Sequence, residues 1–361
     1  MNINPRLRYY PIGVRITLSV LLPMLGLLML AGWIIADKWT LARTADRLQE
    51  MAGLASRLSA VVHELQRERG SSALFLGSKG TAFKEQLATQ RRATDASRTI
   101  LEGSLAKLDP AIRGTLDRKL EVVGKDTREM LARRNDIDAV SVDPREAIAL
   151  YTRTVGDVIS IVKDLALSSP DAQVGNRIAA YVNLMEGKER AGQERATGSA
   201  GFAAGKFPPD LYRRYIALAA EENAFYSVFR TFAAPEVTAF FERTLSGEVV
   251  SEVERFRKIA YDSAFTGHTG EVKAPDWFAA ATRRIDVLKT IEDRIAADLA
   301  GIALDVTRSA YATLWGTLAF TVLLLAGGAF LALAMIQGTT RPLHELTAVM
   351  SRLAAARRPG G

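Results

Sequence analysis

The chain has 361 residues, of which 48% are hydrophobic and 24% are charged, and its formal net charge is +7. It contains no cysteine, which excludes disulfides, thiolate catalysis and thiolate metal sites. Much of the positive excess lies in the two terminal tails, and the rest is interleaved with acidic residues, so we expect no nucleic-acid partner.

Two uncharged, apolar runs frame the chain, and we predict that each is a transmembrane helix, over residues 16–36 and 312–336. A helix of about 20 apolar residues spans the ~30 Å hydrocarbon core of a bilayer. A cleaved signal peptide is the alternative for the first run. However, its apolar core is longer than the usual ~7–15 residues, and no small-x-small cleavage site follows it.

Basic residues outside the two runs predict the orientation of the chain, because cytoplasmic flanks are enriched in lysine and arginine. We therefore expect the tails, residues 1–15 and 337–361, to lie in the cytoplasm. Residues 37–311 then face the periplasm, and the protein is a multi-pass protein of a bacterial inner membrane. The flanking arginines are Arg6, Arg8, Arg15, Arg341, Arg352, Arg357 and Arg358.

The region between the runs has helical periodicity and no sustained period-2 alternation, which predicts an all-α sensor region of about eight helices in two antiparallel bundles. The first helix continues from the membrane to about Ser78. Further helices are predicted over residues 81–107, from Asp109-Pro110 to 138, from Asp143-Pro144 to 167, from Ser169-Pro170 to 204, over 211–232, over 235–266 with a candidate break at Ser246-Gly247, and from Pro275 into the second run.

The end of the first helix places an arginine within an apolar stripe. Leu65, Arg69, Ser72 and Leu76 fall at i, i+4, i+7 and i+11, on one helix face. A guanidinium buried without a partner costs several kcal/mol. Arg69 must therefore pair with a carboxylate, be capped by carbonyl groups, or await an anion.

The same order of residues occurs twice. Residues 66–73 read QRERGSSA, and residues 192–199 read GQERATGS, so each segment has a Glu-Arg pair followed by small and hydroxyl residues. Two helices that each carry an inward arginine beside small residues predict a pocket where they meet. The repetition suggests duplication of a bundle unit, with independent origin of a short motif as the alternative.

The stretches HELQRERGSSALFLGSKGTAF and GKERAGQERATGSAGFAAGKF resemble the nitrate- and nitrite-sensing (NIT) domain, an all-helical sensor module, and the resemblance covers most of residues 37–311. It implies that arginines hold nitrate or nitrite between two bundles, and it places that role on Arg69 and Arg195. Planar guanidinium groups offer paired donors that suit a planar oxyanion. Ser72 and Ser199 are expected to add hydroxyl donors.

The resemblance leaves the remaining arginines of the site open. Arg67 lies about 200° around the helix from Arg69. In the later Glu-Arg-Phe-Arg stretch, spacing favours Arg255, whereas the helical wheel favours Arg257. The candidate ligand-binding residues are Arg67, Arg69, Ser72, Arg195, Ser199, Arg255 and Arg257.

A core ion-pair network is the alternative that needs no ligand, because Glu68 and Glu194 adjoin the two motif arginines. The basic pairs elsewhere are expected on solvated faces. They are Arg91-Arg92, Arg133-Arg134 and Arg213-Arg214.

We expect neither catalysis nor a metal or other cofactor. The sequence assembles no nucleophile with a base, and its histidines are isolated from any pattern of metal ligands. Surface or packing roles are expected for all three, which are His63, His268 and His344.

Beyond the second run, residues 340–347 lead into a heptad-like stripe of Leu343, Leu346, Met350 and Leu353, which resembles the first helix of a HAMP linker. Residues 337–361 do not reach a second HAMP helix, so the type of output (chemotaxis, a kinase or a cyclase) stays open. We expect a homodimeric transmembrane receptor that senses periplasmic nitrate or nitrite and signals to a cytoplasmic module. The alternatives are a receptor for another small anion, such as a carboxylate, and a ligand-free sensor of membrane state.

Overall fold

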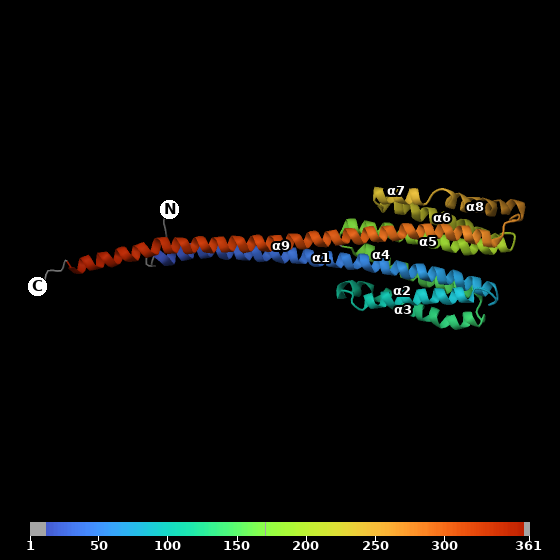
Figure 1. Ribbon diagram of the computed structural model, residues 1–361, viewed down its shortest axis with the longest axis horizontal. Helices are drawn as coiled ribbons and strands as arrows, with labels where there is room; N and C mark the ends of the chain where they lie inside the picture. The colour runs from blue at the N-terminus through green and yellow to red at the C-terminus, as the bar shows by residue number, and fades with distance from the viewer. Residues whose placement is uncertain (1–11, 170, 357–361) are drawn as a thin grey trace. The chain divides into compact units, whose positions relative to one another are not determined.

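The computed structural model describes residues 12–169 and 171–356, and every regular element in this part of the chain is an α-helix, which confirms the predicted all-α class (Figure 1). The tail residues 1–11 and 357–361, which include four of the predicted cytoplasmic arginines and the end of the predicted HAMP helix, lie outside the described residues. In chain order the helices are α1 (Ile12–Gly77), α2 (Lys84–Leu105), α3 (Pro110–Asp138), α4 (Pro144–Ser168), α5 (Ala172–Ala203), α6 (Pro209–Phe232), α7 (Pro235–Thr244), α8 (Glu248–Thr266) and α9 (Ala274–Ala356).

The chain divides into two compact units. Residues 46–305 form one, and the other contains the preceding part of α1 and the part of α9 from residue 306 onward. The two long helices α1 and α9 therefore each contribute to both units.

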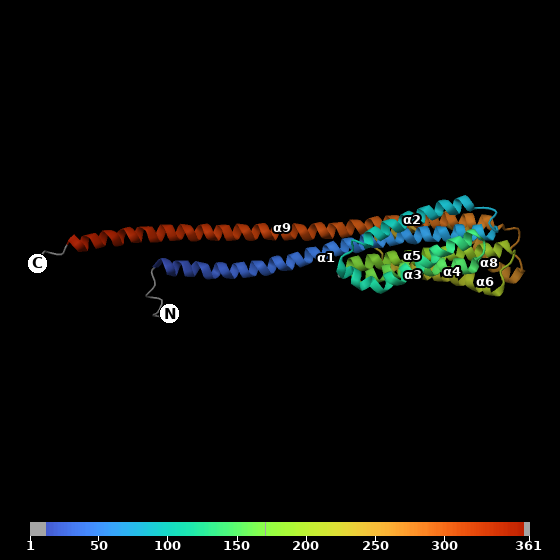
Figure 2. The same cartoon turned by 90° about the horizontal axis from the view of Figure 1, so that it is seen from below.

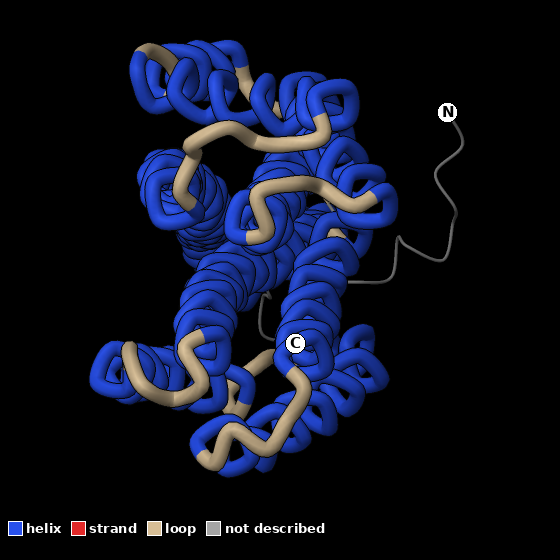
Figure 3. The backbone as a smooth tube through the Cα atoms, turned by 90° about the vertical axis from the view of Figure 1, so that its right-hand side faces the viewer, coloured by secondary structure: helices blue, strands red, loops and turns tan. Residues whose placement is uncertain are grey.

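Within residues 46–305, we refer to α1 to α4 as the first bundle and to α5 to α9 as the second, and Figure 3 shows the helices end-on. Figure 2 shows the same helices from a second side. The helix α5 follows the first bundle in sequence and packs against α4 as well as α6, so it lies at the boundary between the bundles.

Aspartates begin three of the helices, because a carboxylate satisfies the free amides of the first turn. Asp109 and Asp143 accept from the amides of residues 111 and 145 and are each followed by proline, as predicted. The predicted Ser169-Pro170 start includes Pro170, which lies outside the described residues, and the helix expected from about Asp171 begins at Ala172. Ser169 ends α4 in an extended conformation, and Asp171 caps α5 by accepting from the amide of Val174.

The candidate break at Ser246-Gly247 separates α7 from α8. Gly247 has φ 74° and ψ −148°, a conformation open to glycine and costly for other residues. The second bundle therefore builds one of its four positions from two shorter helices.

The second unit holds the apolar runs. Near the first unit's boundary in sequence, Ala42 and Ala45 of α1 pack against Ala310 and Leu314 of α9. Both helices include a window long and apolar enough to cross a membrane by length and composition, and neither window is buried in the protein. Large apolar side chains such as Leu22 and Phe330 point outward, with 74% and 71% of their surface exposed.

Candidate functional site

The arginine of the second motif, Arg195, lies buried on α5 and is held by the first turns of α9. Its Nη1 donates to Thr282 Oγ1 at 2.9 Å, and its Cζ lies 4.7 Å from the ring centroid of Phe278. Trp277 Nε1 donates to the carbonyl oxygen of Arg195 at 2.9 Å, which fixes the backbone as well. Burial, followed by the charge of Arg69, lowers the pKa of Arg195 to about 10, so the group stays charged at neutral pH.

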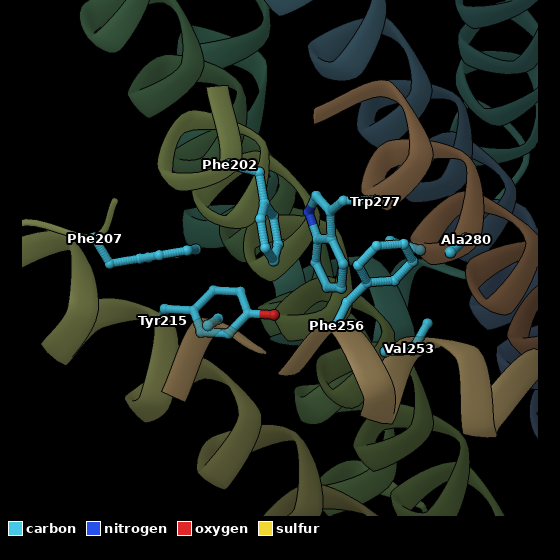
Figure 4. Close-up of a cluster of buried hydrophobic side chains, with 9 residues drawn as sticks. Phe202, Phe207, Tyr215, Val253, Phe256, Trp277 and Ala280 are labelled. Atoms are coloured by element: carbon cyan, nitrogen blue, oxygen red, sulfur yellow. The ribbon is translucent and has the colours of Figure 1, made fainter. Parts of the chain in front are cut away.

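Trp277 belongs to an aromatic cluster that sets this end of α9 against α5 (Figure 4). Its ring centroid lies 5.7 Å from that of Phe202, 5.8 Å from that of Tyr215 and 5.9 Å from that of Phe256. Tilted and edge-on ring pairs at such distances add to the stability gained by burial. The cluster therefore gives Arg195 a rigid setting.

Arg195 differs from the other buried arginines of the described residues because it forms no ion pair. Arg69 pairs with Glu189, Arg257 with Glu194 and Glu222, and Arg284 with Glu222. A buried guanidinium without a counter-ion is costly. Arg195 is therefore the group in this region that an added anion would stabilise most.

Arg69 of the first motif already has a carboxylate. Its Nη1 and Nη2 donate to Glu189 Oε1 and Oε2 at 2.5 and 3.0 Å, and Nη1 also donates to Thr152 Oγ1 at 2.8 Å. Gln66 and Gln193 donate to the same carboxylate at 2.8 and 2.7 Å. Arg69, Glu189 and Arg195 together carry a net charge of +1.

The two arginines approach each other across a small-residue contact between the motif helices. A Cβ on Gly70 would lie 3.0 Å from Arg195 Nη2, and a Cβ on Gly192 would lie 3.0 Å from Arg69 Nη2. Each guanidinium therefore rests against the backbone of the opposite helix, which larger residues would obstruct.

A pocket of about 390 Å³ opens beside Arg195. Its walls come from α1, α2, α5 and α9. Its polar lining includes the cations Arg195 and Arg67, the carboxylates Asp286 and Glu85, and the neutral groups Thr282, Gln66, Ser71 and His63.

The structure places two of the predicted site residues on this pocket, Arg195 and Arg67, with Arg67 exposed to solvent. Arg69 lies behind Gly192 and faces Glu189. Ser72 is buried elsewhere, with its Oγ 3.4 Å from the Tyr151 hydroxyl.

Three further predicted residues do not reach the pocket. Ser199 Oγ donates to the carbonyl oxygen of Arg195 at 2.7 Å, because a helical serine readily bonds the preceding turn. Arg255 is exposed and lies over the ring of its neighbour Phe256. Arg257 is buried, as the helical wheel indicates, but its Nε and Nη2 donate to Glu194 at 2.7 and 2.6 Å.

The motif glutamates do not pair with the motif arginines, so the ion-pair alternative is wrong for Arg195 and names the wrong carboxylate for Arg69. Glu68, fully buried, accepts from Arg134 Nε and Nη2, both at 2.8 Å, and from the Tyr151 hydroxyl at 2.7 Å. Arg134 is thus not on a solvated face, contrary to the prediction, because it spans from α3 to this buried carboxylate.

His63 is a pocket residue that the sequence did not single out. It is 8% exposed, and its Nδ1 has no hydrogen-bond partner among the described residues. Burial, with smaller effects of Lys188, Lys289 and Arg195, lowers the pKa of His63 to about 2. The ring is therefore neutral, and its orphaned nitrogen lies in a region of positive potential.

Comparison with known proteins places this geometry in context. A family model described as nitrate and nitrite sensing matches residues 60–300. A nitrate regulatory protein of Klebsiella oxytoca is 29% identical over 257 residues, which cover 71% of this chain and 64% of that protein, so the chain spans less than two thirds of that relative. The solved structure of the NasR transcription antiterminator aligns with a TM-score of 0.69 and 24% identity over 90% of this chain and 88% of that one, which supports the fold.

Proposed function

Because the chain belongs to the nitrate and nitrite sensing family, we propose that it is a receptor, rather than an enzyme, that binds nitrate or nitrite in the pocket beside Arg195. The observation that carries the proposal is the buried guanidinium of Arg195, which lines a pocket and forms no ion pair within the described residues. A bound monoanion would supply the missing counter-charge.

The local charge supports a monoanion. With Glu189 on Arg69, Arg195 is the member of this trio without a counter-ion, and one nitrate or nitrite would balance it; Asp286 and Glu85 line the same pocket but form no ion pair with Arg195 among the described residues. A guanidinium matches a planar oxyanion with parallel donors, and Ser71 offers a hydroxyl group beside it, whereas the Thr282 hydroxyl already donates to the carbonyl oxygen of Phe278.

We further propose that residues 16–36 and 312–336 cross the inner membrane, that residues 37–311 face the periplasm, and that residues 337–361 begin a HAMP linker to a cytoplasmic output module. The exposed apolar side chains of α1 and α9 support the two spans. The proposed receptor acts as a homodimer, as a parallel HAMP coiled coil requires.

Calorimetry on the full chain in detergent tests the ligand. We expect binding of nitrate or nitrite in preference to chloride and acetate. Arg195→Ala should weaken that binding by about 1.5–3 kcal/mol, roughly ten- to a hundredfold, as for loss of a charge-assisted hydrogen bond. Arg255→Ala, which removes an exposed arginine, is the matched control and should bind like the parent.

A short carboxylate is the second candidate ligand, because a guanidinium also offers paired donors to a carboxylate, as Arg69 does to Glu189. Binding of acetate without nitrate or nitrite would favour it. A chain that binds none of these anions would contradict the receptor proposal.

Reporter fusions test the topology. A reporter inserted at Lys273, in the loop between α8 and α9, should behave as periplasmic, and one after Leu353 as cytoplasmic. The opposite pair of results would contradict the membrane arrangement.

A further inference from the structure

The two motif helices belong to structural repeats with one constant register. Arg69 and Arg195 are 126 residues apart (195 minus 69), and so are Tyr151 of α4 and Trp277 of α9. Each of these two aromatic residues donates a hydrogen bond to the motif helix of its own bundle. Tyr151 donates to the side chain of Glu68 on α1, and Trp277 donates to the carbonyl oxygen of Arg195 on α5.

The ends of the motif helices keep the same register. Lys79 and Gly205, again 126 residues apart, both adopt the left-handed conformation, with φ 53° and 66°. The next amide in each case bonds to the carbonyl oxygen five residues earlier: Gly80 N to Phe75 O at 3.0 Å, and Lys206 N to Gly201 O at 3.2 Å. The equivalence of positions therefore rests on backbone geometry as well as on the short charged motif.

This register identifies what is missing beside Arg195. Glu189, the carboxylate on Arg69, stands six residues before Arg195 on α5. The residue six before Arg69 on α1 is His63. In the first half of the repeat, then, a histidine occupies the position from which the second half supplies a carboxylate to the opposite arginine.

We propose that the anion binds Arg195 in the role that the Glu189 carboxylate plays on Arg69, and that His63 is the specificity-determining residue that leaves this place open. The inference rests on the proposed function and adds to it. It assigns one ligand per chain, gives Glu189 the role of a resident counter-ion, and identifies a pocket residue outside the arginines.

The surroundings of His63 support this role. The side chain lines the pocket together with Arg195, is buried, and has an unpartnered Nδ1. A glutamate at this position would bring its own negative charge to Arg195 and exclude an external anion, whereas a neutral ring leaves the charge unmet. The neighbouring cation Lys188 is fully buried and already paired with Glu292, so among the described residues Arg195 is the buried cation of this region that lacks a counter-ion.

Nitrate titrations of the full chain test the inference with two variants. His63→Glu should pair internally with Arg195, lose nitrate binding by at least about a hundredfold, and melt no lower than the parent without ligand. His63→Gln, the neutral control, should bind within about fivefold of the parent. A folded His63→Glu chain that binds nitrate as the parent does would overturn the inference.

The reciprocal variant and the parent give independent readings. Glu189→Gln should free Arg69 and raise the calorimetric stoichiometry from one nitrate per chain to two; a folded variant that keeps one site contradicts the proposed equivalence.

In the unmodified chain, nitrate should shift the ring ¹⁵N resonances of His63, which are assigned with the variants His268→Gln and His344→Gln. Unchanged His63 resonances at saturating nitrate would also overturn the inference. If the parent binds neither nitrate nor nitrite, the proposed function fails instead.

Discussion

Arg133 and Arg134 are adjacent in sequence, yet only one of them reaches the interior. Arg134 donates to the buried carboxylate of Glu68 and to Asp95, and its side chain is 13% exposed. Arg133 is 40% exposed and pairs with Asp136 and Glu146 at the surface. At the scale of single residues, burial of the partner decides what a charge contributes.

Loss of Arg134 should therefore be far more costly than loss of its neighbour. Arg134→Ala removes the two guanidinium donors closest to the buried Glu68 carboxylate, which keeps Arg91 Nε at 3.9 Å and the Tyr151 hydroxyl. Removal of one partner from a buried pair costs about 3–5 kcal/mol. Arg133→Ala should change the free energy of unfolding by no more than about 1 kcal/mol. Denaturant unfolding of both variants measures the contrast, and equal losses would contradict this account of Glu68.

His63 should make the fold sensitive to acid. Its pKa is about 2 in the folded protein against 6.5 in a free chain, because of burial and the cations Lys188, Lys289 and Arg195 around it. Below pH 6.5 the unfolded chain takes up a proton that the folded chain does not, so stability falls as pH decreases toward 2. The loss approaches about 1.4 kcal/mol per pH unit.

His63→Gln should remove this component. Between pH 7.5 and 5.5, the parent should lose about 1.4 kcal/mol more unfolding free energy than the variant. The two proteins share every other titratable group, including the pocket carboxylates Asp286 and Glu85, so the difference between their losses isolates His63. Parallel losses would show that His63 is protonated in the folded state.

At the scale of helices, the 126-residue register makes the single helix α3 of the first bundle equivalent in position to the pair α7 and α8 of the second. The interruption at Gly247 depends on a conformation that a side chain resists. It gives α8 its own start, from which Arg257 reaches Glu194 and Glu222.

Two glycine substitutions should act with opposite signs. Gly247→Ala should destabilise the fold by about 1–3 kcal/mol, since its backbone conformation is strained for alanine. Gly114→Ala, on an exposed face of α3 with no atom near the added Cβ, should stabilise it by up to about 1 kcal/mol. Melting temperatures compare the two, and a neutral Gly247→Ala would show that the break does not need glycine.

The helices could be predicted because their signals are local. Caps such as Asp109 and Asp143 and the apolar period lie within one helix, and they identified most boundaries. The partners of the buried charges could not be predicted in this way. Arg69 and Glu189 lie on different helices, 120 residues apart in the chain. The helical wheel predicts that Arg257 is buried, but it does not show which carboxylates Arg257 contacts.

At the scale of the whole molecule, α9 contains both the pocket residues Phe278 and Thr282 and the second apolar run in one uninterrupted helix. In the proposed receptor, no loop within α9 would absorb a ligand-dependent shift between the pocket and the apolar run. Ligands bias such an equilibrium by their difference in affinity for its two states, about 1.4 kcal/mol per tenfold.

A flexible insertion should separate binding from signalling. Gly-Gly-Ser-Gly placed after Leu304 in α9 should leave nitrate affinity nearly unchanged but abolish the response of a kinase module fused after the chain. The same insertion after Glu271, in the loop before α9, is the control and should preserve both. Full signalling by the Leu304 variant would show that the signal does not travel along this helix.

The 126-residue repeat has a consequence for how such a site can evolve. In a dimer of identical single bundles, an exact two-fold axis would give both halves the same residue, so a carboxylate would block two arginines and a histidine would expose two. Fusion of the halves into one polypeptide removes that constraint, because Glu189 and His63 can then be selected separately. A repeated fold in one polypeptide can thus hold one half closed by its own carboxylate and one half open to an anion, which gives a single-ligand site.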